Sequence, residues 1–269
     1  MHAPLLLAAL LLFGVSSPLL AAEAEGESRV TVLPLFLVRK GEPEPSRDES
    51  ERLMRHIEWS QKRYRELLGG AHSFELESKS PEVYRAEHDL NFYRRQPEGA
   101  APRFVAELLR HFRVSRTECR SVYLIVVMNP YDNFPNGGGR PINGGYGTGG
   151  GVLTLSSYAL DRIPNFQSTL RHELGHSFGL PHVNSYGYSM SGSPSIMSYN
   201  PAHHTDGFHD SETPGTLIPE DRRGLAKNQR VFPGLRFDPA TDVPAGYRMH
   251  GVVVLKPMTL PTDPPPGET

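Results

Sequence analysis

Cysteine is nearly absent from this chain of 269 residues, in which Cys119 is the single example. One cysteine cannot form an internal disulfide, so the fold must rest on its apolar core and on any bound metal. Net charge is also small: 28 lysine and arginine residues stand against 30 aspartate and glutamate residues, a formal net charge of -2 at pH 7. This balance gives no reason to expect a nucleic acid or an anionic membrane as a partner.

Long apolar runs are lacking beyond the N-terminus. A helix that crosses a bilayer needs about 20 consecutive apolar residues, and no later segment reaches that length. Residues 5–15 are apolar, Pro18 follows shortly after, and Ala-Glu-Ala at 22–24 resembles a signal-peptidase site. An uncleaved anchor is the alternative, since no Lys or Arg precedes the run. We expect residues 1–24 to be the signal peptide of a secreted or periplasmic protein, with no stable membrane insertion.

Glycine and proline are abundant, with 26 and 25 residues, which predicts long loops. The densest glycine stretch is a loop predicted at 129–151. A phosphate-binding loop would lead into a helix, whereas this one leads into the strand-like run 151–156. Carboxylates are too few there for a calcium site. We expect flexibility near a cleft, or close approach of a substrate to the backbone.

Alternating apolar segments predict a sheet covered by helices. The runs 30–38 and 121–128 are rich in β-branched residues and indicate buried strands. Pro34 lies inside the first run, and a residue without an N–H predicts a bulge or an edge position there. This order favours a mixed α/β or α+β class. Strands are expected at 30–38, 73–77, 121–128 and 151–156, and helices at 48–68, 101–112, 166–178 and 220–228.

The stretch H-E-L-G-H-S-F-G-L-P-H at 172–182 carries the chemistry. Residues four apart share one helix face, so the imidazoles of His172 and His176 can converge on one point. Gly179 permits the turn that ends the helix, after which His182 can supply a third nitrogen. A catalytic zinc takes three such ligands and keeps one position for water, on which Glu173 can act as general base. These residues predict a zinc hydrolase site with one Zn²⁺ per chain.

This stretch, followed by S-I-M-S-Y at 195–199, resembles the extended zinc motif and the Met-turn of the metzincin metallopeptidases. The resemblance is sharp over 172–199 and loose over 28–230. It implies an α+β, metzincin-like (zincin) domain, with a twisted mixed five-stranded sheet and helices in an upper lobe above a small irregular lower lobe. We therefore expect a catalytic domain at 28–238, divided near residue 182 into its upper lobe and a lower lobe at 183–238. A C-terminal extension with a proline-rich tail would follow at 239–269.

The same resemblance implies roles for further residues. Met197 would be a structural floor under the zinc, and Gly179 would shape the turn beside it. Tyr199 would ligate zinc or stabilise the tetrahedral intermediate, with simple packing as the alternative. An antiparallel edge strand would pair with an extended protein or peptide substrate. The residues expected on that strand are Gly151, Val152, Leu153 and Thr154.

Two features depart from the family pattern. Val183, directly after the third histidine, matches no particular branch of the metzincins. No pro-segment is recognisable before the first strand, and Cys119 lies inside the catalytic span, so we expect a buried structural cysteine and no latency device. The branch is therefore left unassigned.

The resemblance and the residues together predict an exported zinc endopeptidase. Two alternatives stay open: an amidase acting on a non-protein amide such as peptidoglycan, and a zinc-binding adhesion module without turnover. Glu173 argues against the adhesion module, because zinc binding needs the histidines alone. The histidine-rich run at 203–210 reads as a solvated loop, with a second metal site as the alternative.

Overall fold

The structure is a computed structural model. It describes residues 29–89, 92–93, 103–115, 119–129, 137–142, 149–160, 163–200, 215–251, 253, 255 and 258. The expected signal peptide at 1–24, the histidine-rich run at 203–210 and the tail at 261–269 lie outside these residues. Within them, no helix is both long and apolar enough to cross a bilayer.

A mixed sheet of five strands forms the centre of the fold, in the order β2-β1-β3-β5-β4. Four strands are parallel, and β4 alone runs antiparallel to its neighbour β5. The expected α+β, zincin-like architecture with a mixed five-stranded sheet is thus confirmed. The strands are β1 (Thr31–Val38), β2 (Glu82–Arg85), β3 (Ser121–Val127), β4 (Gly137–Pro141) and β5 (Gly151–Ser156).

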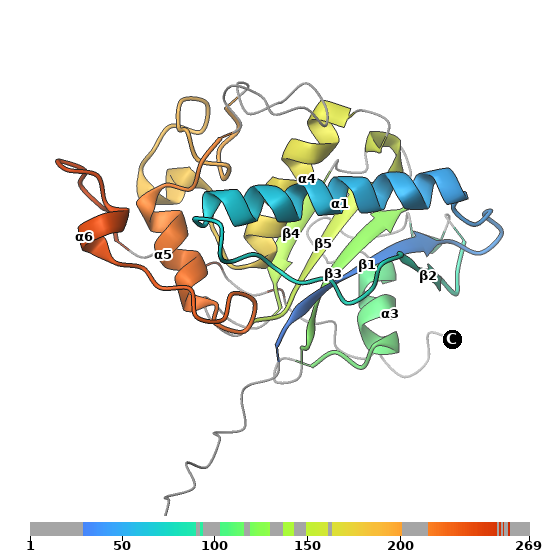
Figure 1. Cartoon of the computed structure of the whole chain (residues 1–269). Coiled ribbons are helices and arrows are strands. Elements are labelled where there is room, and N and C mark those ends of the chain that lie inside the picture. The colour runs from blue at the N-terminus through green and yellow to red at the C-terminus, as the bar shows by residue number, and fades with distance from the viewer. Residues whose placement is uncertain are drawn as a thin grey trace, which may run out of the picture.

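Helices cover both faces of the sheet (Figure 1). Side chains of a strand alternate between faces, so Val32 and Phe36 of β1 point toward α1 and α4, whereas Leu33 and Leu35 point toward α3. A capping box at Ser46 begins α1. The helices are α1 (Arg47–Leu67), α3 (Arg103–His111), α4 (Ile163–Ser177), α5 (Pro219–Lys227) and α6 (Pro239–Asp242), with short 3-10 turns η1 (Ser157–Ala159) and η2 (Val183–Tyr186).

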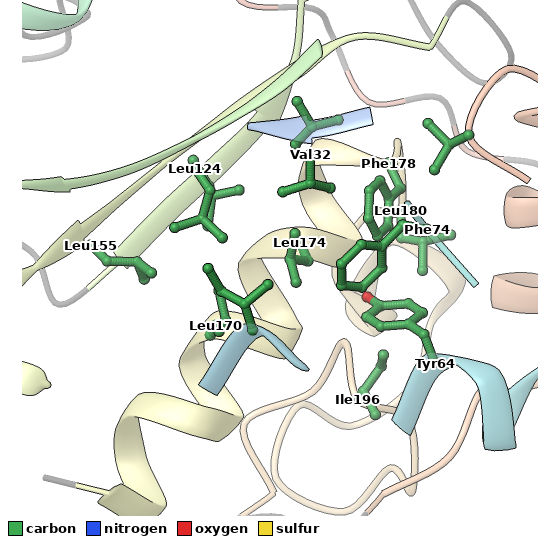
Figure 2. Close-up of a cluster of buried hydrophobic side chains, with 14 of the residues drawn as sticks. Val32, Tyr64, Phe74, Leu124, Leu155, Leu170, Leu174, Phe178, Leu180 and Ile196 are labelled. Carbon is green, nitrogen blue, oxygen red and sulfur yellow. The ribbon is translucent and has the colours of Figure 1, made fainter. Parts of the chain in front are cut away.

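The larger core lies between the sheet, α1 and α4 (Figure 2). Leu170, Leu174 and Phe178 form the apolar stripe of α4, one turn apart, and all three are buried. Tyr64 of α1 is fully buried beside them and donates a hydrogen bond of 2.9 Å from its hydroxyl to the carbonyl of Arg171. This contact ties α1 to the middle of α4, directly before the histidine motif.

Pro34 occupies neither a bulge nor an edge, because β1 lies between β2 and β3. Val32 donates to and accepts from the chain on the β2 side, and the Val38 carbonyl accepts from the Ala86 N–H there. Strand alternation turns position 34 to that side as well. There the neighbouring chain pairs with β1 only at Leu76 and again from Glu82. The missing N–H of Pro34 therefore falls in a gap between two paired stretches of the neighbouring chain.

The expected edge strand is wrong. Gly151 to Thr154 lie on β5, which pairs with β3 on one side and β4 on the other. The antiparallel edge is β4, inside the stretch 129–151 that the sequence predicted to be a loop. Its residues, Gly-Gly-Gly-Arg-Pro, have no apolar alternation and therefore no strand signal.

Glycine in β4 permits unusually close packing against α4. A Cβ at Gly139 would lie 2.2 Å from the carbonyl oxygen of Glu173, and a Cβ at Gly137 would lie 2.7 Å from Thr169. Gly138 points the other way, where a Cβ would meet nothing nearer than 3.9 Å. The edge strand can lie on the motif helix because its two inward positions carry no side chain.

The lower lobe is irregular and is organised around a buried carboxylate at the start of α5. Asp221 is fully buried and accepts hydrogen bonds from the Ser195 hydroxyl at 2.5 Å and the Ile218 N–H at 3.2 Å. The Ser195 hydroxyl in turn accepts from the N–H of Met197 at 2.9 Å. Burial raises the pKa of Asp221 to about 7. This chain of contacts holds the loop that passes beneath the histidine motif.

The segment after residue 238 packs on the lower lobe as far as the structure describes it. The carboxylate of Glu220 accepts hydrogen bonds from the Tyr188 hydroxyl at 3.1 Å, the Tyr247 hydroxyl at 2.9 Å and the His250 N–H at 2.8 Å. Asp242 of α6 forms an ion pair with Arg222 at 2.9 Å. Residues 242–250 thus contact α5 directly, and the structure does not separate them from the lower lobe. The domain boundary expected at residue 238 stays a prediction.

Gly139→Ala tests the contact between β4 and α4. The added Cβ would overlap the Glu173 carbonyl, so we expect the free energy of unfolding to fall by roughly 1–3 kcal/mol. Gly138→Ala is the matched control and should stay close to the native stability, because its Cβ has open space. Chemical unfolding measures both, and equal stability of the two variants would show that the close approach is absent.

Asp221→Asn tests the buried carboxylate. Its folded pKa of about 7 lies above the ordinary 3.8, so at intermediate pH the folded protein holds a proton that the unfolded chain has released. The free energy of unfolding therefore falls as pH rises through this window and levels off above about pH 7. Asparagine keeps an acceptor and cannot ionise, so the variant should gain roughly 1–3 kcal/mol relative to the native protein at about pH 8, compared with about pH 4. An identical stability difference at both pH values would contradict this assignment.

Candidate metal centre and active site

The end of α4 places the three motif histidines. His172 and His176 lie one turn apart on the helix, and Gly179 then adopts φ 106°, a left-handed conformation that favours glycine. The N–H of Gly179 donates to the His176 carbonyl and the N–H of Leu180 to the Gly175 carbonyl, which closes the helix. The chain reverses there and returns His182 to the same side.

The three imidazoles meet at their Nε2 atoms. The Nε2 atoms of His172 and His176 are 3.1 Å apart, those of His176 and His182 3.0 Å, and those of His182 and His172 3.1 Å. Three nitrogens at about 2.0–2.1 Å from a tetrahedral zinc would be about 3.3 Å apart. The observed triangle is slightly smaller and has the size of a zinc site.

Hydrogen bonds at Nδ1 of His172 and His176 determine which ring nitrogen carries the proton. Nδ1 of His172 lies 2.8 Å from the Ile196 carbonyl, and Nδ1 of His176 lies 2.7 Å from the Leu180 carbonyl. A carbonyl only accepts, so in each neutral ring Nδ1 carries the proton and Nε2 carries a lone pair. Two lone pairs that face each other at 3.1 Å repel unless a cation lies between them. The donor set therefore fits a metal ion, and an imidazole set fits zinc.

Burial also keeps the histidines neutral. Burial, together with the neighbouring rings of His172 and His182, lowers the pKa of His176 to about 3. Burial likewise lowers the pKa of the half-buried His182. Neutral imidazole is the form that ligates a metal, so neither residue has to lose a proton at neutral pH.

Glu173 projects from α4 toward the edge strand. Burial raises the pKa of its carboxyl group to about 7, and a hydrogen bond from the Gly139 N–H acts in the opposite direction. A carboxyl group with a pKa near neutrality can both accept and return a proton, as a general base must. Glu173 thus lies beside the histidine triad and against β4, the edge strand of the sheet.

Met197 lies directly beneath the motif helix. It is fully buried, and a Cβ at Gly175 would lie 2.4 Å from its sulfur. The carbonyl of Met197 accepts a hydrogen bond from the N–H of Val183 at 3.3 Å. Glycine at position 175 of the motif is therefore needed to let the methionine approach. The expected role of Met197 as a floor under the zinc stays a prediction, and its buried side chain packs on the helix that carries His172 and His176.

Tyr199 stands at the open side of the triad. Its side chain is 59% exposed, and its hydroxyl lies 2.9 Å from Nε2 of His182. Its backbone N–H donates to the Met190 carbonyl at 2.7 Å, which anchors the residue while the ring reaches outward. Burial and the nearby Glu173 carboxylate raise the pKa of the phenol. The hydroxyl is close enough to the nitrogens to contact a metal or a bound substrate.

A pocket opens beside the triad toward the first half of α4. The sequence analysis did not single out Arg171 as a site residue. Arg171 is among the residues that line this pocket, and it is only 1% exposed. Its Nε and Nη1 have no hydrogen-bond partner in the structure, and its guanidinium lies 5.6 Å over the Trp59 ring. Burial lowers its pKa to about 10, so it stays cationic at neutral pH. The pocket is lined by Ser168, Thr169, Arg171, His172, Glu173, Ile196, Ser198, Tyr199 and Asn200.

A second group of potential ligands, Glu87, His88 and Glu107, lies on the other face of the sheet. Glu107 is buried there, and its carboxylate accepts hydrogen bonds from the hydroxyls of Tyr84 and Tyr93 and from the N–H of Glu87. Those donors occupy the carboxylate, so this group is explained as internal structure. Cys119 is buried as expected, and burial raises the pKa of its thiol to about 11.

Comparison with known proteins agrees with this geometry. No family model matches the chain. A curated relative, an archaemetzincin of Nanoarchaeum equitans (strain Kin4-M), is 31% identical over 124 residues, which are 45% of this chain and 63% of the relative. The chain therefore covers less than two thirds of the length of that protein.

One solved structure supports the same fold. A catalytically inactive OgpA from Akkermansia muciniphila, in complex with an O-glycopeptide, superposes with a TM-score of 0.51 at 19% identity, covering 77% of this chain and 63% of that one. A wild-type crystal form of OgpA matches with a TM-score of 0.47 at 19% identity, over 76% and 62% of the two chains. The eleven-residue motif at 172–182, the Met-turn beneath it and the fold together resemble those of the metzincin-type zinc metallopeptidases.

Proposed function

We propose that the protein is an exported, zinc-dependent endopeptidase with His172, His176 and His182 as zinc ligands, one ion per chain. The observation that carries this proposal is the convergence of three Nε2 atoms within 3.1 Å of one another. The carbonyl partners of His172 and His176 leave those two nitrogens as lone pairs. Glu173 beside them distinguishes a hydrolytic centre from a site that only binds metal. Export rests on the signal-like residues 1–24.

A zinc ion in this site would lower the pKa of a bound water and polarise the carbonyl to be cleaved. Glu173 would take the proton of the attacking water and deliver it to the leaving amine. Glu173 lies beside the edge strand, because the Gly139 backbone approaches the Glu173 carbonyl closely. The carboxylate would therefore be near a peptide bond bound along that strand.

Tyr199 is proposed to contact the oxyanion. Its hydroxyl lies 2.9 Å from Nε2 of His182, and the exposed ring leaves it free to adjust when a substrate enters. A donor aimed at a developing oxyanion contributes about 3–4 kcal/mol in other hydrolases. The anchored backbone of Tyr199 keeps the ring within reach of the triad.

The substrate is proposed to be a protein or peptide bound in extended form along β4. An edge strand presents unpaired N–H and C=O groups to which such a chain can pair. The ligand of the OgpA complex, an O-glycopeptide, is itself a peptide and supports this class of substrate. Cleavage of matched peptides with and without an O-linked sugar would test this class of substrate, and cleavage of a peptidoglycan fragment would favour the amidase alternative.

Glu173→Gln tests the general base. With zinc present, the native protein should cleave an unstructured protein substrate, and the variant should be slower by about 10²–10⁴-fold. Zinc content should remain one ion per chain, because the three histidines are unchanged. Glu58→Gln, on the exposed face of α1, is the control and should cleave at the native rate. Equal cleavage by Glu173→Gln would remove Glu173 from the mechanism, and absence of cleavage by the native protein would favour the adhesion module.

His182→Ala tests the third ligand. Loss of one of three protein ligands should weaken zinc affinity by at least about 100-fold and abolish cleavage together with it. His72→Ala removes a half-buried histidine outside the triad and should keep one zinc per chain. Elemental analysis after dialysis against a weak chelator measures the difference. Retention of one tightly held zinc by His182→Ala would rule out this ligand.

A further inference from the structure

The C-terminal extension, the segment that follows residue 238, takes no part in the proposed zinc chemistry, yet it is fixed to both lobes. The Tyr247 hydroxyl and the His250 N–H donate to the buried Glu220 carboxylate of the lower lobe, at 2.9 Å and 2.8 Å. Val253 packs against the larger core. Met258 is only 8% exposed and belongs to the smaller core, on the α3 face of the sheet. The described residues of the extension therefore contact the lower lobe and the sheet alike.

Met258 reaches the edge strand. Its N–H donates to the carbonyl of Pro141, the last residue of β4, at 2.9 Å. The N–H of Ile142, the next residue, donates to the Gly150 carbonyl on the side of β5. Successive residues of a strand direct their N–H and C=O groups to opposite sides, so the Pro141 carbonyl points to the open edge of β4. The extension thus occupies one end of the edge to which a substrate is proposed to pair.

The contacts between β4 and α4 give the direction of a bound peptide. A Cβ at Gly137 would meet the side chains of Thr169 and Glu173, and a Cβ at Gly139 would meet the Glu173 carbonyl and the Ser177 hydroxyl. The strand and the helix therefore run in the same direction. A peptide that pairs antiparallel with β4 runs the opposite way, so its residues before the cleaved bond lie toward the C-terminal end of the strand.

The position of Pro141 shows where that pairing would end. Glu173, the proposed general base, lies against Gly137 and Gly139, so the cleaved bond is expected opposite this part of β4. Pro141 lies two positions beyond Gly139 in the strand, or about 7 Å along it. Its carbonyl would be the partner of roughly the third residue before the cleaved bond. Met258 already holds that acceptor.

We propose that the C-terminal extension closes the open edge of β4 at Pro141 and so ends the substrate groove about three residues before the cleaved bond. The inference rests on the proposed peptidase function and names a specificity of the same site. Substrate residues farther from the bond on that side gain no main-chain hydrogen bonds from β4, because the extension takes their place. Met258 is thus a specificity-determining residue that lies outside the expected catalytic domain.

Acetylated peptides that share the residues after the cleaved bond, and lengthen one residue at a time before it, test the proposal. With zinc, the kcat/KM of the native protein should rise with length and level off at about the third residue. Met258→Pro removes the N–H donor, and a chain that ends at Gly251 removes Met258 altogether. In both variants kcat/KM should rise further with longer peptides, by at least about threefold.

Matched controls separate the edge from general damage. Met258→Leu keeps the N–H and an apolar side chain, so it should level off at the same length as the native protein. Peptides that lengthen only after the cleaved bond should show the same length dependence in the native protein and in Met258→Pro. One zinc per chain and an unchanged rate with the shortest peptide show that a variant has kept its active site. A change confined to the peptides lengthened after the bond would overturn the proposed direction.

Binding of both peptide series to the Glu173→Gln protein gives a measurement that does not need turnover. Affinity should level off at the same length, and Met258→Pro in this background should extend it. An unchanged length dependence in zinc-loaded Met258→Pro and in the shortened chain overturns the proposal and leaves the peptidase function intact. Self-association of the shortened chain without a changed length dependence also overturns it, because the extension would then only protect the edge. The expected binding pattern without cleavage by the native protein supports the closed edge and refutes the proposed function.

Discussion

Two backbone carbonyls determine which nitrogen of His172 and of His176 is available to a metal ion. The Leu180 carbonyl comes from the turn that ends α4, and the Ile196 carbonyl comes from the loop of the lower lobe. Each carbonyl accepts a hydrogen bond from the Nδ1–H of one histidine, so the Nε2 lone pair of that ring points toward the shared point. The metal site therefore depends on the two lobes being held in register. Without the lower-lobe carbonyl, His172 could adopt the other tautomer.

That register rests on contacts that carry no metal-binding chemistry of their own. Asp221 holds the Ser195 hydroxyl, which holds the Met197 N–H, and Met197 then packs on Gly175 of the motif helix. Tyr64 of α1 holds the same helix through a hydrogen bond to the Arg171 carbonyl. The triad is thus supported by buried polar contacts in one lobe and by an apolar core in the other. Each support is local, and together they place three nitrogens within 3.1 Å.

The motif helix serves different partners on its different faces. Leu170 and Leu174 contact the sheet and α1, the histidines face the metal position, and a third face receives the backbone of β4. That third contact explains why three of the five residues of β4 are glycine. A side chain at position 139 would push the strand away from Glu173. The general base and the proposed substrate strand are therefore positioned by a single close approach.

Strong periodic segments were predicted well from the sequence because their signal is local. The apolar runs of β1 and β3, and the heptad-like stripe of α1, fell within a few residues of the observed elements. Weak segments were not: β2 at Glu82–Arg85 has one buried residue, and β4 has no apolar pattern at all. The position expected from Pro34, a bulge or an edge, was wrong. A proline is tolerated inside β1 because the neighbouring chain, which pairs at Leu76 and again from Glu82, leaves a gap there.

The sequence by itself determined which residues could hold a metal. His172, His176 and His182 lie within eleven residues of one another in the sequence. The helical spacing and the glycine turn after the helix can therefore bring them together without a contact from a distant part of the chain. Only the tertiary structure decided that β4, and not β5, is the edge strand, and that Arg171 is buried with two guanidinium nitrogens lacking a hydrogen bond. Strand order and the partner of a buried charge depend on residues far apart in the chain. Their packing is settled by the whole fold, which no local pattern encodes.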